Sequence, residues 1–233
     1  MKRLHTPDEI NEALKLVDAW KDPALPSRQW AAIESERVMI HKGRQNEIAP
    51  YRALDEALKC VLLPNTPDTT ILDLGAGSGI YREIIRRAGY RWSYEAADYS
   101  SHFRDWAKML QPDINYSLTD ATDMNWTDNS VDVLLHGCCL IHIKDWHKAM
   151  QEAARVTSKY VIFHRTPLVD GPTQYWLKEA YGVPCFDIWF GREEFWRQLM
   201  KVGLSEVAYE PVFETNQPDH YGHYTVVCEK RNA

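Results

Sequence analysis

The stretch that decides the fold is Ile71-Leu72-Asp73-Leu74-Gly75-Ala76-Gly77-Ser78-Gly79-Ile80. Its first four residues include three aliphatic side chains, as in a buried parallel strand. Three glycines in the next five positions let the backbone turn tightly and let a ligand approach it closely. Because such a loop leads into a helix, the free N–H groups of the helix N-terminus favour an anionic or polar ligand. The stretch therefore predicts a cofactor-binding loop between a strand and a helix.

The spacing of the glycines distinguishes between kinds of cofactor. A dinucleotide fingerprint places its third glycine three positions after the second, and here that position is Ile80, which disfavours an NAD-dependent dehydrogenase. With Asp73 two residues before the first glycine, the run resembles motif I of the class I S-adenosylmethionine-dependent methyltransferases. The resemblance implies S-adenosylmethionine as the cofactor. It implies contacts to the cofactor from Gly75, Ala76, Gly77 and Gly79. Asp73, also a predicted cofactor-site residue, lies just before the turn and can hold the N–H groups of the loop or interact with the amine of the methionine portion, directly or through water.

Composition limits the remaining possibilities. The chain has 233 residues, which suits one α/β domain with additions. A net charge of −6 disfavours broad binding of nucleic acid, which needs a basic surface. The five cysteines lack CxxC spacing, so we expect free thiols and no metal site. Neither a secretory signal nor a membrane-spanning run is evident, and we expect a cytoplasmic location.

From residue 69 onward, short apolar runs alternate with helical stretches, which is typical of βαβ units and a parallel sheet. Strands are expected at 70–74, 92–97, 114–118, 131–135, 160–163, 205–210 and 223–229. Helices are expected at 81–87, 101–110, 144–156 and 192–202. The order matches the methyltransferase family, so the resemblance, over roughly residues 50 to 230, implies an α/β fold of three Rossmann-like layers. Its seven-stranded, mostly parallel sheet ends in an antiparallel pair.

The chain is expected to divide into an N-terminal helical arm, residues 1–66, and a methyltransferase domain, residues 67–233. Helical spacing of apolar residues predicts helices at 7–20, 27–41 and 50–63, with proline-containing breaks between them. This arm is expected to cover the ligand. In the second part, residues 165–191 are rich in proline and aromatic residues, and we expect an irregular insertion on the substrate side.

Two acidic residues follow successive strands, where ligands of open parallel sheets bind. Asp98 ends the second strand of the βαβ pattern, and its carboxylate can accept hydrogen bonds from two ribose hydroxyls. Asp120 follows the third strand and resembles the family's adenine-reading position, with Asp123 as a rival. A solvated loop or a helix cap is the structural alternative for these residues. The neighbouring Tyr99 and Ala121 belong to the same predicted cofactor site.

Histidines gather at the ends of the fourth and fifth strands. His136 and Gly137 lie where the family packs the methionine end of the cofactor. His142 and His164 are the two candidates for a general base, although a single histidine is more often structural than catalytic. Arg165 can bind a carboxylate or phosphate of the acceptor, or pair on the surface. The predicted acceptor-binding residues are Arg165, Tyr175 and Trp189.

The favoured hypothesis is a methyltransferase that acts on an O or N atom of a small molecule such as a sugar or natural product. Arg165-Thr166-Pro167 and the aromatic insertion after it add a weaker resemblance to a little-characterised methyltransferase branch. One alternative is an S-adenosylmethionine-binding protein without transfer activity. Another is an RNA methyltransferase with a local basic surface formed by Arg82, Arg86, Arg87 and Arg91, although we expect these residues to form a solvated helix face. The sequence leaves the oligomeric state open.

Overall fold

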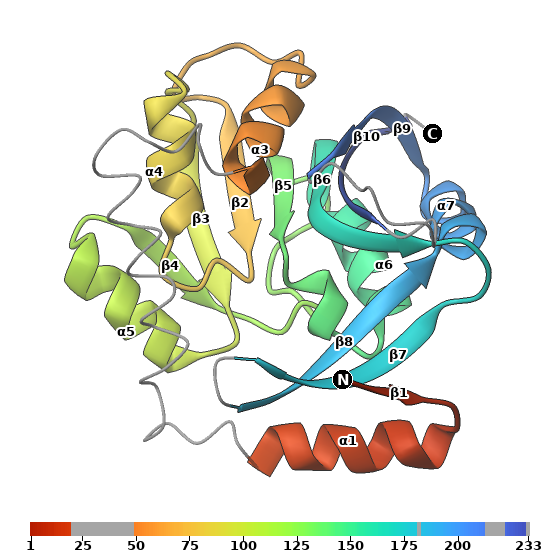
Figure 1. Cartoon of the computed structure of the whole chain (residues 1–233). Helices are drawn as coiled ribbons and strands as arrows, with labels where there is room; N and C mark the ends of the chain where they lie inside the picture. The colour runs from red at the N-terminus through yellow and green to blue at the C-terminus, as the bar shows by residue number, and fades with distance from the viewer. Residues whose placement is uncertain (20–48, 181–182, 213–221, 232–233) are drawn as a thin grey trace.

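The computed structural model of the protein describes residues 1–19, 49–180, 183–212 and 222–231. Seven strands form its main sheet: β2 (Thr70–Leu74), β3 (Ser93–Asp98), β4 (Asn115–Leu118), β5 (Val131–Gly137), β6 (Thr157–Val169), β9 (Leu204–Pro211) and β10 (Gly222–Lys230). Their order in the sheet is β4-β3-β2-β5-β6-β10-β9 (Figure 1). Strands β2 to β6 are parallel, whereas β10 is antiparallel to both β6 and β9. The predicted mostly parallel Rossmann-like sheet is confirmed, but the predicted count of seven strands is too low: three further strands, described below, join through the end of β6, and the described sheet has ten.

Helices cover both faces of this sheet, which completes the three predicted layers. They are α3 (Ala49–Lys59), α4 (Ile80–Arg87), α5 (Ser101–Leu110), α6 (Trp146–Val156) and α7 (Arg192–Lys201). Because side chains alternate along a strand, consecutive residues of one strand enter different cores. Leu72 and Leu134 pack with α6 and α7, whereas Ile71 and Val133 pack with α3 and α4. Continuously apolar strands are therefore buried on both faces.

Most predicted elements agree with the structure within a few residues. The predicted helix 101–110 coincides with α5, and the predicted strand 70–74 coincides with β2. The predicted helices 7–20 and 50–63 correspond to α1 (Pro7–Ala19) and α3, while the one at 27–41 lies outside the described residues. Within the described ranges, no helix is long and apolar enough to cross a membrane.

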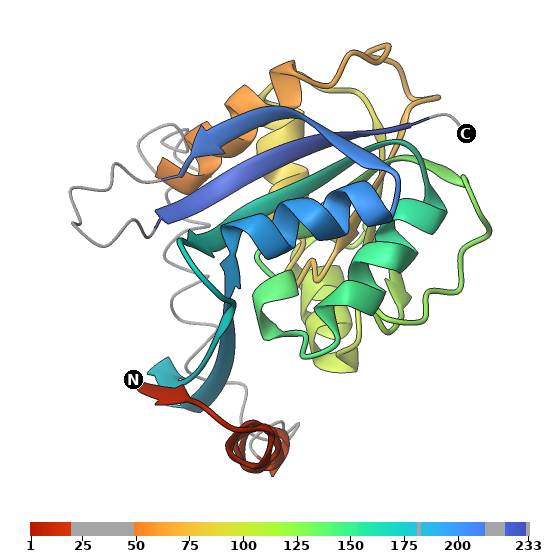
Figure 2. The ribbon, with the colours of Figure 1, turned by 90° about the vertical axis from the view of Figure 1, so that its right-hand side faces the viewer.

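The prediction of an irregular insertion at 165–191 is wrong. Strand β6 continues to Val169, and β7 (Gln174–Ala180) then pairs with β8 (Val183–Gly191) in an antiparallel hairpin. A short strand, β1 (Lys2–Leu4), adds to the outer edge of β7, and α1 packs against β8. The hairpin projects from the main sheet and carries β1 and α1 with it (Figure 2). Proline usually indicates a break in a strand, but Pro167 and Pro184 both occupy paired positions within strands.

The two faces of the hairpin have different chemistry. Tyr175, Leu177, Phe186 and Ile188 share the face that packs into the main core. Since directly paired residues point to the same side of an antiparallel pair, the other face carries the intervening residues. These are Gln174, Trp176, Lys178, Cys185, Asp187 and Trp189. The hairpin lies beyond the carboxyl ends of β2 and β5, where a parallel sheet binds its ligands (Figure 1).

Candidate active site

The glycine loop has the conformation and the crowding that only glycine tolerates. Gly75, Gly77 and Gly79 have φ angles of 73°, 54° and 72°, in the left-handed region. The N–H groups of Gly75 and Ala76 donate to the Ala97 carbonyl at 2.8 and 3.0 Å. A Cβ atom on Gly75 would lie 2.2 Å from the Cβ of Cys139. The loop is therefore held against the ends of β3 and β5.

Asp73 is a fully buried carboxylate beneath this loop. The Tyr94 hydroxyl donates to its Oδ2 atom, while Oδ1 has no hydrogen-bond partner among the described residues. Burial raises the pKa of Asp73 to about 7, an effect that the Tyr94 hydrogen bond opposes and the nearby Asp98 reinforces. The site thus holds a carboxyl group that a cationic ligand would stabilise in its ionised form.

We predict that Asp73→Asn stabilises the ligand-free protein at pH 8. Because the folded-state pKa of Asp73 is above its ordinary value of 3.8, stability is lost as the pH rises from about 4 towards 7, and asparagine has no such loss. The melting temperature of the variant should exceed that of the wild type at pH 8, and the difference should shrink towards pH 4. A difference that does not depend on pH would contradict the assignment.

Asp98, at the end of β3, is also buried, with 5% of its surface exposed. Its carboxylate accepts hydrogen bonds from the N–H groups of Gly77 at 3.2 Å and Ser100 at 3.0 Å. Burial nevertheless raises the pKa of Asp98 above its ordinary value. The cap of α5 is Ser100, whose hydroxyl accepts from the Phe103 N–H. Asp98 is therefore tied to the glycine loop, and its oxygens can accept further hydrogen bonds.

The other predicted cofactor residues lie around these two carboxylates. Asp120 is exposed in the loop after β4, and its Oδ1 accepts from the Thr122 N–H at 2.7 Å. The Thr119 N–H donates to the Asp98 carbonyl, which places this loop next to the end of β3. Tyr99 is 63% exposed, and Ala121 is half-buried. Asp123, the rival of Asp120, pairs with it in an isolated β-bridge.

His136 and Gly137 end β5 in tight packing. The His136 ring is buried, stacks on Phe163 and has its Nδ1 3.0 Å from the Cys139 Sγ. Burial lowers the pKa of His136 to about 3, so the ring is neutral. The Cys139 thiol donates to the Leu74 carbonyl, which connects this segment to the glycine loop. A Cβ on Gly137 would lie 2.2 Å from the Tyr81 ring.

The two candidate bases have very different surroundings. His164 is 1% exposed, its Nδ1 lies 2.8 Å from the Thr225 hydroxyl, and its ring meets Tyr81 edge to face. Burial first and Arg165 second lower the pKa of His164 well below its ordinary range. His142, in the short 3₁₀ helix η2 (Leu140–His142), has 47% of its side chain exposed. Only His142 therefore combines an accessible ring with a position at the strand ends.

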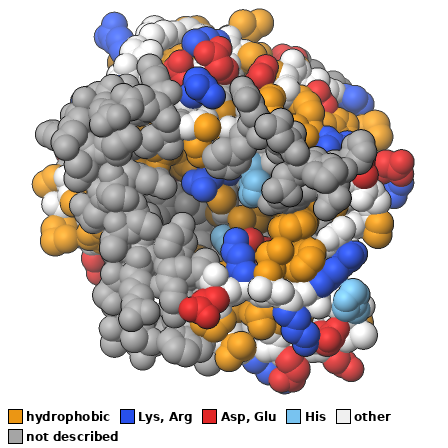
Figure 3. Space-filling model, in the orientation of Figure 1, with side chains coloured by type: hydrophobic (Ala, Val, Ile, Leu, Met, Phe, Trp, Pro, Cys, Tyr) orange, Lys and Arg blue, Asp and Glu red, His pale blue; other side chains and the backbone are white. Residues whose placement is uncertain are grey.

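His142 belongs to a group that the sequence analysis missed. Its Nδ1 lies 2.7 Å from the Phe186 carbonyl and 3.3 Å from Asp187 Oδ1. Lys178 forms an ion pair with the other oxygen of Asp187. Lys178 and Asp187 belong to different strands of the hairpin. The alternation of apolar and polar residues within 174–190 is the sequence signal that could have predicted these strands and their polar face. Figure 3 shows histidine, acidic and basic side chains gathered near the centre of this face of the molecule.

The three predicted acceptor-binding residues do not share one surface, because Tyr175 and Trp189 lie on opposite faces of the hairpin. Arg165 follows the end of the parallel part of β6 with a φ of 58°, and its carbonyl lies 3.4 Å from His223 Nδ1. Trp189 is on the hairpin face that carries Asp187, and its ring centre lies 4.7 Å from that of Trp176. Tyr175 is on the opposite face and stacks on Phe186. The structure therefore brings Trp189, but not Tyr175, to the face that carries Asp187.

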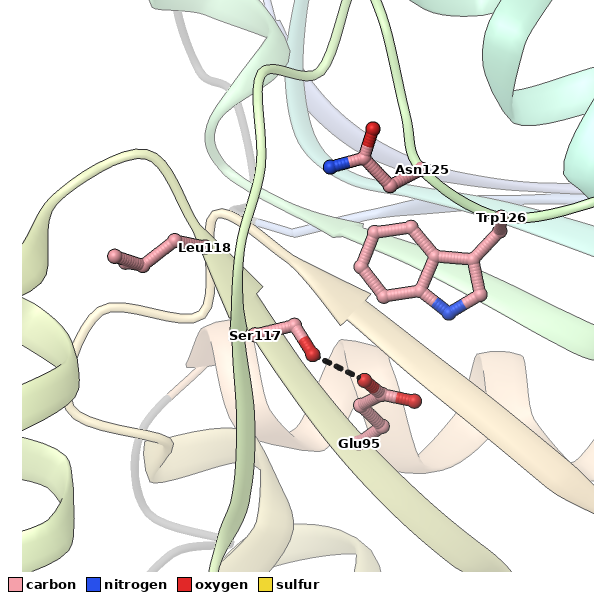
Figure 4. Close-up of a pocket in the computed structure, with 5 residues that line it drawn as sticks. All are labelled: Glu95, Ser117, Leu118, Asn125 and Trp126. Carbon is pink, nitrogen blue, oxygen red and sulfur yellow. Dashed lines mark hydrogen bonds between the residues drawn. The ribbon is translucent and has the colours of Figure 1, made fainter.

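A pocket of about 360 Å³ lies elsewhere, beside β3 and β4. Glu95, Ser117, Leu118, Asn125 and Trp126 line it, and the Ser117 hydroxyl donates to Glu95 (Figure 4). Glu95 is three residues before Asp98 on β3, so the two side chains leave the strand on different faces. The residues that line this pocket include none from the glycine loop. On α4, Arg82 binds Asp113 through two hydrogen bonds, which engages one of the four arginines considered for RNA binding.

Comparison with known proteins agrees with this site. A family model described as a methyltransferase domain matches residues 72–163. The 2-phytyl-1,4-naphtoquinone methyltransferase of Nostoc sp. is 30% identical over 142 residues, and the match spans 55% of this chain and 62% of that protein. The demethylmenaquinone methyltransferase of Renibacterium salmoninarum is 33% identical over 166 residues, which span 61% of this chain and 69% of that protein.

A solved structure shows the same fold across the chain. The 1,6-didemethyltoxoflavin-N1-methyltransferase of Burkholderia thailandensis, with its acceptor and S-adenosylhomocysteine bound, has a TM-score of 0.59. It is 16% identical, and the superposition covers 100% of this chain and 93% of that one.

The strand order, the glycine loop and the two buried carboxylates define a Rossmann-like enzyme that binds a nucleoside-type cofactor. The curated relatives narrow this class: the chain belongs to the class I S-adenosylmethionine-dependent methyltransferases. Its cofactor is S-adenosylmethionine, and two observations fit that molecule. The unpartnered Oδ1 of Asp73 suits an ammonium group, and the Asp98 carboxylate suits ribose hydroxyls.

Proposed function

We propose that this protein methylates an O or N atom of a small acceptor that binds between the strand ends and the polar face of the hairpin. The observation that carries the proposal is the position of His142. Its half-exposed ring lies at the carboxyl end of β5 and contacts the hairpin at Phe186 and Asp187. A base at this place is useful only if an acceptor must lose a proton, as hydroxyl and N–H acceptors do.

Each residue of the site has a proposed role. Asp73, Asp98 and the N–H groups of the glycine loop hold the cofactor, with Asp120 and Ala121 at its adenine end and His136 and Gly137 at its methionine end. The cofactor supplies an electrophilic methyl group. His142 accepts the acceptor's proton on Nε2, while Arg165 and Trp189 orient the acceptor. His164 has a packing role, because its ring is buried, neutral and bonded to Thr225.

We also propose that the acceptor is a planar aromatic natural product rather than a sugar. The hairpin presents two indole rings, those of Trp176 and Trp189, beside the ionic pair of Lys178 and Asp187. Flat aromatic surfaces favour stacking with a flat acceptor. Two curated relatives are named for quinones, and the Burkholderia thailandensis enzyme is named for a ring system with a methylated nitrogen.

Cofactor binding is the first test. Calorimetric titration with S-adenosylhomocysteine should show binding to the wild type, and Asp98→Asn should weaken it by about 10-fold to 100-fold, since a hydrogen bond to a charged group contributes roughly 1.5–3 kcal/mol. Glu95→Gln is the matched control, because Glu95 belongs to the same strand and lines the pocket beside β3 and β4. Undiminished binding by Asp98→Asn, or equal losses in both variants, would reject the assigned cofactor site.

Acceptor turnover is the second test. Labelled S-adenosylmethionine should be offered with 1,4-dihydroxynaphthalene, a simple phenol, an aromatic amine, a hexose and an RNA oligonucleotide. Transfer to an aromatic hydroxyl or amine supports the proposal. Transfer to the hexose or to RNA instead would reject the aromatic acceptor class and assign the acceptor to sugars or to RNA. If the protein binds the cofactor but transfers no label to any of these acceptors, it is better described as a binding protein without transfer activity.

A further inference from the structure

A buried carboxylate, Asp187 of β8, lies behind the exposed histidine. We infer that Asp187 is a positioning residue for His142: it holds the ring with the hydrogen on Nδ1 and leaves Nε2 as the proton acceptor. This inference rests on the proposed function, because it assigns how the base of that reaction is prepared. It adds a residue from the hairpin to a site that the glycine loop and the strand ends otherwise build.

The contacts of the ring decide its tautomer. His142 Nδ1 is 2.7 Å from the carbonyl oxygen of Phe186, and a carbonyl can only accept a hydrogen bond. Asp187 Oδ1 is buried, lies 3.3 Å from the same nitrogen at ion-pair distance, and has no hydrogen-bond partner among the described residues. The carbonyl bonded to Nδ1 and the unpartnered carboxylate oxygen beside it both favour the hydrogen on Nδ1, so a neutral ring keeps its lone pair on Nε2. The 47% exposure of the side chain leaves that nitrogen accessible to an acceptor molecule.

The charges around Asp187 keep it ionised. Burial acts to raise the pKa of Asp187, but His142 and Lys178 outweigh it and lower the pKa below its ordinary value. Lys178 binds the second carboxylate oxygen. His223 also interacts electrostatically with Asp187, and burial lowers the pKa of His223 although the hydrogen bond to the Arg165 carbonyl opposes that effect. A fixed negative charge therefore remains beside His142 and stabilises the imidazolium that forms when Nε2 takes a proton.

The arrangement supports removal of one proton from the acceptor as the methyl group is transferred. The O–H or N–H proton of the acceptor moves to His142 Nε2, and the electron pair of that bond forms the new bond to the methyl carbon. The electron pair of the broken carbon–sulfur bond stays on sulfur, which neutralises the sulfonium charge. The imidazolium then returns its proton to water, and Asp187 remains a carboxylate throughout.

The tautomer can be measured without any ligand. In the wild type labelled with ¹⁵N-histidine, the nitrogen shifts of neutral His142 should show the hydrogen on Nδ1. In Asp187→Asn, Lys178 retains the amide oxygen and the amide N–H₂ turns towards Nδ1, so part of the population should move its hydrogen to Nε2. A wild-type ring with its hydrogen on Nε2 overturns the inference even if the variant does not fold. An unchanged tautomer in the folded variant also overturns it.

Steady-state kinetics provide the second readout, measured with whichever acceptor the wild type methylates in the screen described above. Asp187→Asn should lower kcat by about 10-fold to 100-fold and change KM and the S-adenosylhomocysteine Kd by less than about two-fold. Asp128→Asn, a 70% exposed carboxylate paired with Arg155, is the control and should match the wild type. An unchanged kcat, or a loss confined to KM, overturns the inference. Failure of the proposed function is distinguishable, because it removes turnover from the wild type while leaving the ring spectrum as expected.

Discussion

His142→Gln is expected to lower kcat by about 100-fold to 10,000-fold, the usual contribution of a general base. Glutamine can still donate to the Phe186 carbonyl, as the histidine Nδ1 does, but it cannot take up a proton. Because the ring is half-exposed and lies outside the glycine loop, the variant should fold normally and bind S-adenosylhomocysteine with wild-type affinity. The measurement is turnover with the acceptor of the screen, together with calorimetry.

His164→Gln is the comparison that separates the two candidate histidines. His164 is buried against Tyr81 and lies within hydrogen-bond distance of Thr225, so its replacement should lower thermal stability. Turnover per folded molecule should stay within a few-fold of the wild type. The opposite pattern, with an active His142→Gln and an inactive but stable His164→Gln, would transfer the role of base to His164.

Gly75→Ala is expected to abolish cofactor binding and to destabilise the protein by roughly 2–5 kcal/mol. The φ angle of 73° is unfavourable for alanine, and the new methyl group would lie 2.2 Å from Cys139 Cβ and 2.7 Å from its sulfur. Neither the loop nor Cys139 can move freely, because the Gly75 and Ala76 N–H groups bind Ala97 and the Cys139 thiol binds Leu74. Relief of the clash must therefore displace the loop that we propose holds the cofactor.

Gly89→Ala is the matched control, since Gly89 has a φ of 90° and nothing within 4 Å of an added Cβ. It should lose only the conformational term, about 1 kcal/mol, and bind S-adenosylhomocysteine as the wild type does. Chemical denaturation and calorimetry on both variants check the pair. Equal stability losses with intact cofactor binding in Gly75→Ala would show that Cys139 does not restrain the loop.

The main sheet could be predicted because its signals are local. Ile71, Leu72 and Leu74 are apolar on both faces of a strand, and Gly75, Gly77 and Gly79 mark the turn that follows. The hairpin was missed for a corresponding reason. Its strands alternate correctly, but Pro167 and Pro184 look like breaks, and the sequence does not show that these positions are paired.

The residues from Ile71 to Ile80, with Asp98 one strand later, were enough to predict the kind of cofactor, because motif spacing is a property of neighbouring residues. The group around His142 was not predictable in this way. Asp187 and Lys178 reach it through the register of β7 on β8, and His142 lies 45 and 36 residues before them (187 − 142 and 178 − 142). Pairing between distant segments depends on tertiary packing, so the proposed acceptor side of this enzyme forms only when the chain has folded.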